Sequence, residues 1–316
     1  MLHSVICDIL GIRYPVFQGG MAWIADGTLA AAVSEAGGLG LVSSINFGPE
    51  AVRAEIRKAR SLTSKPFGVN VMLAAPDAAE VAKIVVEEGV GIVTTGAGTP
   101  APYMEMWKEA GIKVIPVVAS VAYALKVQEL GATAVVAEGA ESGGHIGELH
   151  TMALVPQIVD AVDIPVLAAG GIFDGRGAAA AFMLGACGVQ LGTRFLMAKE
   201  CHIHPVYKER LIKATDIGTM VTGRSLKDSV RGLKTPFAKQ FAKMEEDPSV
   251  SPEEIRAFGT GSLRKAVMDG DLTHGSFLAG EVAGMIHKEE SAKEIVEDIV
   301  FGAEKIMKEK SLIYES

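Results

Sequence analysis

The segment Glu129-Leu-Gly-Ala-Thr-Ala-Val-Val-Ala-Glu138 joins the predicted end of a helix to a glycine and a short apolar strand. Glycine readily takes the left-handed conformation just past a helix, and a short apolar run after it suits a buried strand of a parallel sheet. The same pattern recurs at residues 35–42, 87–93, 109–118 and 183–191. Three more strands are expected to begin with a proline, which a strand tolerates at its first position, at Pro15, Pro66 and Pro165.

These patterns together predict eight strands, at residues 15–18, 39–43, 66–71, 91–95, 113–118, 133–137, 165–169 and 188–191. Helices are expected between most of them, for example at Thr28–Ala36, Glu50–Ser61, Ala78–Glu88 and Tyr103–Ala110. Eight evenly spaced βα units within about 200 residues favour a (β/α)₈ TIM barrel. The alternative is an open doubly wound sheet, but the first strand is not followed by the GxGxxG pattern of that fold.

The chain changes character after the eighth predicted strand. Residues 204–274 are more charged and less regular, and they predict a smaller, mostly helical cap without a convincing strand. The barrel domain would then comprise residues 1–203 and 275–316. Within its second part, Ser276–Met307 returns to helical periodicity and is expected to pack on the barrel.

Composition narrows the class of protein. The 316 residues are 49% hydrophobic and carry a net charge of −8, which argues against a nucleic-acid-binding protein. No apolar stretch approaches the roughly 18–20 residues of a membrane span, and the first eight residues lack the features of a signal peptide. The three cysteines show no CxxC or metal-ligand spacing, so the sequence predicts a cytoplasmic protein without a bound metal.

Glycines and small polar residues follow the predicted strands, whereas the strands themselves are apolar. Because the active site of a parallel barrel lies at the carboxyl ends of its strands, these residues predict a ligand site. They are Gln18–Met21, Ser43–Ser44, Asn70, Thr94–Gly96, Ser120, Glu138, Glu141–His145, Gly170–Gly171 and Gln190–Thr193. The loops after strands seven and eight commonly bind phosphate in such barrels, and here they contain glycines and the Thr193 hydroxyl.

Individual residues at these ends remain open to two interpretations. Asn70 either contacts a ligand edge or makes a structural hydrogen bond. The adjacent Gly143 and Gly144 leave room for a flat ligand against the backbone or only form a turn. His145 is a candidate proton donor or base, because imidazole titrates near neutral pH; the alternative is a structural histidine.

With these motifs in order, the chain resembles the flavin-dependent enoyl-acyl-carrier-protein reductase II family, which belongs to the nitronate monooxygenase superfamily. The shared motifs are Gln18-Gly-Gly-Met21, Ala36-Gly-Gly-Leu-Gly40, Asn70, Gly143-Gly-His145-x-Gly147, Ala168-Ala-Gly-Gly-Ile172 and Gln190-x-Gly-Thr-Arg194. Segments that favour the reductase branch include Lys65–Val71, Val230–Lys234 and Gly259–Leu263.

This resemblance implies reduction of a trans-2-enoyl thioester of acyl carrier protein or CoA with NADH or NADPH, the last step of fatty acid elongation. It implies that His145 is the catalytic residue and that FMN is contacted by the residues at the matching positions of this chain. Those positions are Gly20, Met21, Ala22, Asn70, Glu138, Gly143, Gly144, Gly170, Gly171, Gln190, Gly192 and Thr193. The resemblance also implies a homodimer and activation by a monovalent cation, K⁺ or NH₄⁺, without assigning the cation a site.

Two other functions compete with this expectation. A nitronate monooxygenase would share the flavin but use O₂, and a flavin-free barrel would bind only a phosphate-bearing ligand. Basic residues in the cap either dock an acidic acyl carrier protein or form a solvated helix face. They are Arg224, Lys227, Arg231, Lys234, Lys239 and Lys243.

Overall fold

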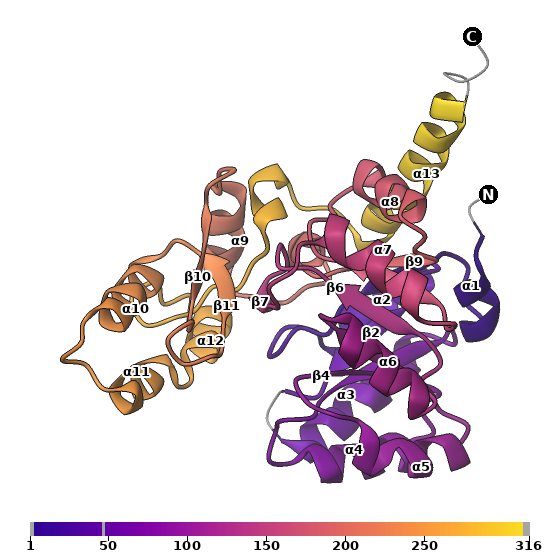
Figure 1. The fold of residues 1–316 in the computed structure, drawn as a ribbon, viewed down its shortest axis with the longest axis horizontal. Coiled ribbons are helices and arrows are strands. Elements are labelled where there is room, and N and C mark those ends of the chain that lie inside the picture. Colours follow the sequence, from indigo (N-terminus) through magenta and orange to yellow (C-terminus); the bar gives the residue numbers. More distant parts are fainter. Residues whose placement is uncertain (1–2, 46–47, 312–316) are drawn as a thin grey trace.

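The computed structural model describes residues 3–45 and 48–311, and it contains a closed barrel of parallel strands (Figure 1). The strands are β1 (Val16–Gln18), β2 (Gly40–Ser43), β3 (Phe67–Met72), β4 (Ile92–Gly96), β5 (Lys113–Val118), β6 (Val135–Glu138), β8 (Val166–Ala169) and β9 (Gly188–Leu191). They pair in the order β1-β9-β8-β6-β5-β4-β3-β2, and a parallel bridge between Phe17 and Leu39 brings β2 back to β1. The predicted TIM barrel is confirmed. The first and last residues of each predicted strand lie within two residues of those of the observed strand.

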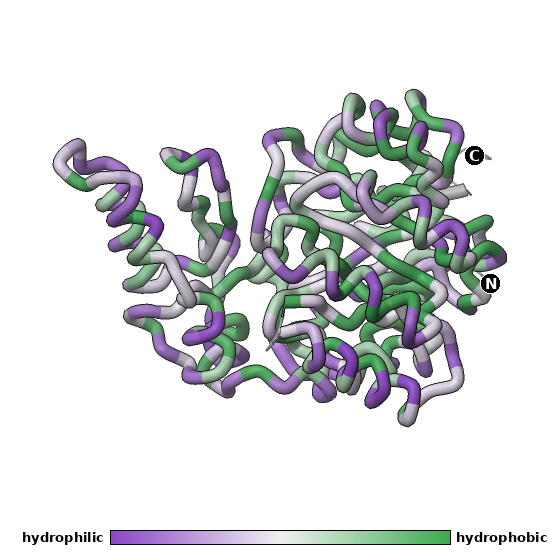
Figure 2. The backbone as a smooth tube through the Cα atoms, turned by 90° about the horizontal axis from the view of Figure 1, so that it is seen from below, coloured by the Kyte–Doolittle hydropathy of each residue, from purple (hydrophilic) through white to green (hydrophobic). Residues whose placement is uncertain are grey.

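Helices alternate with these strands and cover the outside of the barrel. They are α2 (Gly27–Glu35), α3 (Pro49–Leu62), α4 (Ala78–Glu87), α5 (Ala101–Glu109), α6 (Val121–Glu129), α7 (Thr151–Ala161) and α8 (Gly175–Met183). Side chains of Asp26, Ser120 and Asp174 accept backbone N–H groups at the starts of α2, α6 and α8, which satisfies donors that a helix leaves free. Figure 2 shows the hydrophobic segments gathered along the barrel strands.

The amino-terminal end of the barrel is closed by a short helix, α1 (Val5–Leu10). Its Ile6 and Leu10 join a buried apolar cluster with Phe17 from β1 and Ile115 from β5. The Ser4 hydroxyl donates to the carbonyl oxygen of Cys187, immediately before β9. Apolar packing therefore fills this end of the barrel.

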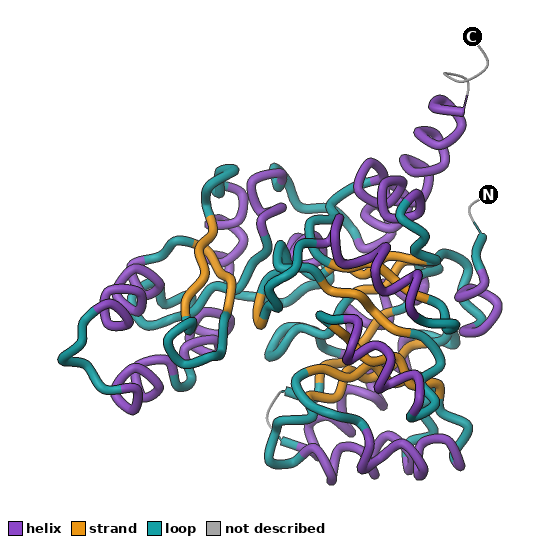
Figure 3. The backbone as a smooth tube through the Cα atoms, in the orientation of Figure 1, coloured by secondary structure: helices purple, strands orange, loops and turns teal. Residues whose placement is uncertain are grey.

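The cap (residues 204–274) lies to one side of the barrel (Figure 3) and mixes helices with a small sheet. A short helix, η1 (Thr193–Met197), precedes the cap. The elements of the cap are α9 (Pro205–Ile212), β10 (Thr219–Thr222), β11 (Val230–Leu233), α10 (Pro236–Glu246), α11 (Pro252–Gly259), α12 (Ser262–Arg264) and η2 (Lys265–Asp269). The expectation of a cap without strands is wrong. Strands β10 and β11 pair in antiparallel fashion, and β11 also pairs with β7 (Gly144–His145), a segment for which the sequence predicted no strand.

The chain after the cap returns to the barrel mostly without regular structure. It contains η3 (Glu281–Met285) and then the long helix α13 (Ala292–Ser311), which packs on α8 and α2. The periodicity predicted helix from about Ser276, but the long helix begins only at Ala292. No helix among residues 3–45 and 48–311 is both long and apolar enough to cross a membrane.

The division of the chain into a barrel (1–203 and 275–316) and a cap (204–274) remains our proposal. Residues 1–2, 46–47 and 312–316 of the proposed barrel lie outside the described part of the chain. Contacts cross the proposed boundary, because the Leu233 backbone N–H donates to the Phe277 carbonyl at 2.7 Å.

Candidate functional site

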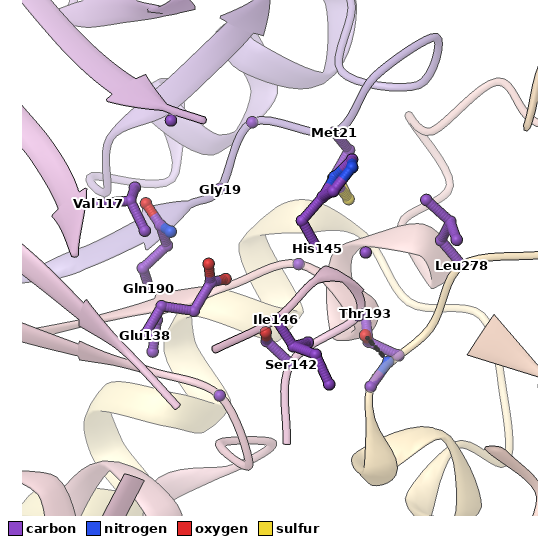
Figure 4. A pocket seen from close by; sticks show the side chains of 18 of the residues that line it. Gly19, Met21, Val117, Glu138, Ser142, His145, Ile146, Gln190, Thr193 and Leu278 are labelled. Carbon is purple, nitrogen blue, oxygen red and sulfur yellow. Dashed lines mark hydrogen bonds between the residues drawn. The ribbon is translucent and has the colours of Figure 1, made fainter. Parts of the chain in front are cut away.

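The carboxyl ends of the strands open into a cavity of about 710 Å³ (Figure 4). Every residue that the resemblance assigns to FMN or to catalysis lines it: Gly20, Met21, Ala22, Asn70, Glu138, Gly143, Gly144, His145, Gly170, Gly171, Gln190, Gly192 and Thr193. Of the wider set of residues expected at the strand ends, five do not line the cavity: Gln18, Ser44, Thr94, Thr95 and Ser120. Residues outside the barrel strands complete the wall, including Asp228 and Leu263 of the cap and Leu278 of the returning segment. The structure thus brings the predicted positions together at one site.

The loop after β1 fits against β3 and β9 because its first two residues, Gly19 and Gly20, are glycines. A Cβ atom added to Gly20 would lie 2.2 Å from Cγ of Asn70. One added to Gly19 would lie 3.2 Å from the side chain of Gln190. The preceding Gln18 is fully buried, and its Oε1 accepts the Leu41 backbone N–H at 3.1 Å. Gln18 therefore holds the loop, and the glycines leave the cavity open above it.

Asn70 makes the structural hydrogen bond that was one of its two interpretations. Its Oδ1 accepts the Thr94 hydroxyl at 2.8 Å. The side chain also lines the cavity, and its amide nitrogen has no hydrogen-bond partner among the described residues. The bond to Thr94 orients the amide and leaves its nitrogen to donate to a ligand.

Glu138 and Gln190 lie next to each other and project into the cavity (Figure 4). Burial raises the pKa of Glu138 to about 7. Oε1 of Gln190 and Oγ of Ser142 are buried and have no hydrogen-bond partner in the part of the chain that the structure describes. Buried polar atoms are normally satisfied, so these groups indicate a polar edge of a ligand.

The loops after β8 and β9 form the part of the wall suited to a phosphate. Gly170 and Gly171 have φ angles of +92° and +70°, and a Cβ on Gly170 would lie 2.8 Å from the Gly139 carbonyl oxygen. Oγ1 of Thr193 accepts the Gly280 backbone N–H at 2.9 Å, which leaves the hydroxyl proton to donate. None of the described residues that line the cavity is lysine or arginine, so a phosphate here would depend on backbone N–H groups.

Glu141, the second carboxylate of the loop after β6, has a structural role. Both of its carboxylate oxygens lie 3.0 Å from the Thr151 backbone nitrogen at the start of α7. Its Oε2 also accepts the Thr151 hydroxyl at 2.9 Å, and the same hydroxyl lies 2.9 Å from the Gly170 carbonyl oxygen. Glu141 therefore ties the loop after β6 to the loop after β8.

His145 lies at the outer wall, on strand β7 of the sheet shared with the cap. It pairs in register with Val230 of β11. Its Nε2 lies 3.2 Å from Oδ1 of Asp228, and both side chains are about half exposed. Asp228 was not predicted, because nothing in its local sequence marks it as a neighbour of His145.

Arg231 does not belong to the predicted basic surface of the cap. It is buried, its Nε donates to the Ala140 carbonyl at 3.1 Å, and its Nη2 lies 3.1 Å from Oε1 of Glu281. Arg231 therefore joins the cap strand β11 to the barrel loops. The other five predicted basic residues are exposed: Arg224, Lys227, Lys234, Lys239 and Lys243.

A parallel barrel with a glycine-lined cavity at the carboxyl ends of its strands is typical of TIM-barrel enzymes. Comparison with known families identifies the family within this class. Residues 3–302 match the family described as nitronate monooxygenase. The chain belongs to this family and is an oxidoreductase.

Individual relatives align with nearly the whole chain. The structure of FabK from Thermotoga maritima is 48% identical, with a TM-score of 0.96 over 98% of this chain and 99% of that one. A (3aS,4S,5R,7aS)-5-hydroxy-7a-methyl-1-oxo-octahydro-1H-indene-4-carboxyl-CoA dehydrogenase of Mycobacterium tuberculosis is 34% identical over 96% of each chain. A probable nitronate monooxygenase of Staphylococcus aureus is 33% identical over 85% of this chain and 89% of its own.

Proposed function

We propose that the protein is an FMN-dependent enoyl-acyl-carrier-protein reductase. The observation that carries the proposal is the cavity at the strand ends, which combines glycine walls with unpartnered buried polar atoms. The resemblance to enoyl-acyl-carrier-protein reductase II and the 48% identity with FabK support the reductase branch of the family. The substrate would be a trans-2-enoyl thioester of acyl carrier protein or CoA.

The cavity residues fit FMN in three groups. Backbone N–H groups of Gly171, Gly192 and Thr193 would hold the phosphate, together with the Thr193 hydroxyl. The glycines of the β1 loop, with Gly143 and Gly144, would leave space for the flat ring. Asn70, Glu138 and Gln190 would hydrogen-bond the polar edge of the ring, and the raised pKa of Glu138 lets its neutral carboxyl donate near neutral pH.

Bound FMN would supply hydride transfer from NADH or NADPH to the β-carbon of the enoyl thioester. The protein has to bring the thioester to the cavity and provide a proton for its α-carbon. His145 is the titratable side chain on the outer wall that could give this proton. Hydride at the β-carbon and a proton at the α-carbon together saturate the double bond, and NAD⁺ or NADP⁺ is the second product.

An anaerobic half-reaction tests this function. The FMN-reconstituted protein is mixed with NADH without oxygen, and we expect its flavin absorbance to bleach and then to return on addition of crotonyl thioester. In the His145→Ala variant the return should slow about a hundredfold, while bleaching should stay unchanged. Absence of bleaching in the wild-type protein would contradict the reductase.

Nitronate monooxygenase activity is the second candidate, because the matching family and the S. aureus relative carry that name. A protein that ignores NADH but consumes O₂ with an alkyl nitronate would have this activity instead. A colourless protein after incubation with FMN would favour the flavin-free alternative.

Several finer features remain part of the proposal. Residues 204–274 contain 12 lysines and arginines against 10 acidic residues, although the whole chain carries a net charge of −8. This difference supports docking of an acidic acyl carrier protein on the exposed basic side chains of the cap. A homodimer and activation by K⁺ or NH₄⁺ are further proposals that rest on the resemblance. A cytoplasmic location is a proposal that rests on the three sparse cysteines.

A further inference from the structure

The contact between His145 and Asp228 joins two segments far apart in the sequence. Strand β7 pairs with β11 through His145 and Val230, and the Ile146 backbone N–H donates to the Ser229 carbonyl at 3.0 Å. This register brings Asp228 beside the imidazole, with 3.2 Å between Oδ1 and Nε2. Both residues line the cavity. The contact is therefore built by the sheet that the barrel loop shares with the cap.

The loop that carries Asp228 is anchored on both sides. The Asp228 backbone N–H donates to the Gly223 carbonyl at 3.0 Å, and a Cβ on Gly223 would lie 2.1 Å from the Asp228 carbonyl oxygen. From helix α10, the Glu245 carboxylate accepts the backbone N–H groups of Gly223 and Ser225, each at 2.9 Å. These bonds hold the β10–β11 loop in the conformation that presents Asp228 to His145.

We propose that Asp228 is a positioning residue for His145, an inference that rests on the proposed reductase function. Its carboxylate accepts the proton of Nε2 and fixes the orientation of the ring. Nδ1 then becomes the nitrogen available to the substrate, since it has no partner among the described residues. In the reaction the Nδ1–H bond of the imidazolium breaks, the α-carbon gains that proton, and His145 is left neutral.

An exposed ion pair often contributes nothing measurable, and the chain offers such a pair for comparison. His3 and Asp8 lie 3.0 Å apart at the amino-terminal end, and both are more than half exposed. Neither of these residues lines the cavity. Asp8→Asn is therefore the matched control for Asp228→Asn, because it removes the same type of contact away from the site.

A double-mutant cycle on the oxidative half-reaction tests the role of Asp228. Proteins reduced by NADH are mixed with crotonyl thioester, and the rate of flavin reoxidation is measured. We expect Asp228→Asn to slow reoxidation about tenfold and His145→Ala about a hundredfold, with the double variant no slower than His145→Ala alone. Reduction by NADH should be the same in all variants, and Asp8→Asn should match the wild type.

Two results of this cycle would overturn the inference. One is a wild-type rate in Asp228→Asn, and the other is a double variant slowed by the product of the single effects, since independent roles multiply. If the thioester fails to reoxidise even the wild-type protein, the proposed function has failed instead.

A measurement without turnover tests the contact in either case. The protein contains seven histidines, and ¹³Cε1 labelling allows the His145 resonance to be identified by its loss in His145→Ala. Relaxation should show an ordered His145 ring in the wild type and in Asp8→Asn, and a mobile ring in Asp228→Asn. A ring equally ordered in Asp228→Asn would contradict a positioning role.

Discussion

The two ends of the barrel differ in their lining: one is closed by apolar packing, and the other contains polar groups without hydrogen-bond partners. At the amino-terminal end, α1 closes an apolar cluster that includes Phe17, Leu41 and Ile115, all fully buried. At the carboxyl end, the cavity is lined by glycines and contains the unpartnered oxygens of Ser142 and Gln190. The first end stabilises the fold by burial, whereas the second keeps polar groups free for a ligand at a cost in stability.

The largest expected effect is at the closed end. Ile115→Ala should lower the free energy of unfolding by about 2–5 kcal/mol, because it leaves a cavity in a close-packed cluster. Urea denaturation measures this loss. The control is Leu62→Ala, whose side chain is 52% exposed, and it should change stability by less than about 0.5 kcal/mol. An equal loss in both variants would contradict the role given to the closed end.

Glu138→Gln, at the open end, should raise the free energy of unfolding instead of lowering it. The pKa of Glu138 is raised to about 7 from its ordinary 4.5, so the unfolded chain releases this proton at lower pH than the folded protein. The carboxyl therefore destabilises the fold progressively as the pH rises from about 4.5 to about 7. The glutamine variant, which does not titrate, should be more stable than wild type by about 3 kcal/mol at pH 8 and nearly equal to it at pH 4.

Urea denaturation of the FMN-free protein at both pH values measures this difference. Glu129→Gln, on the exposed surface of α6, is the control and should show no such dependence on pH. A constant difference between Glu138→Gln and wild type across this range would show that Glu138 does not titrate with a raised pKa.

The smallest effect is expected for Gln190→Met, which keeps the volume of the side chain. Removing a buried oxygen without a partner should stabilise the FMN-free protein by about 1 kcal/mol or leave it unchanged. The affinity for FMN, measured by quenching of flavin fluorescence, should fall about tenfold if Gln190 contacts the ring. A variant that loses stability without FMN would show that Gln190 is already satisfied within the protein.

The strands of the barrel were predictable because their signals are local. A glycine such as Gly131, with φ +91°, ends a helix, and the strand that follows, β6, begins with two fully buried β-branched residues, Val135 and Val136. The strands of the cap lack such signals. Thr219–Thr222 is half-buried along its whole length, and β7 has only two residues. These strands form because β11 pairs with both of them, which is a contact between distant segments.

The functional site likewise has features that the sequence predicted and features that it did not. Its glycines and polar residues were predictable because the ends of parallel strands must meet at one edge. The roles of its carboxylates were not, since Glu138 at the end of β6 and Glu141 in the loop that follows are only three residues apart. Both line the cavity, and only the surroundings separate them: burial raises the pKa of Glu138, whereas the carboxylate of Glu141 binds the start of α7.

The sequence by itself determined the barrel, the edge at which the ligand site lies and the glycines and polar residues that the strand ends contribute to it, because helix ends, strand periodicity and strand direction are local properties. The tertiary structure alone decided that Arg231 is buried between cap and barrel, that Glu138 has a raised pKa, and that Asp228 meets His145. Each of these depends on the burial or proximity of groups from distant segments, which no local pattern in the chain specifies.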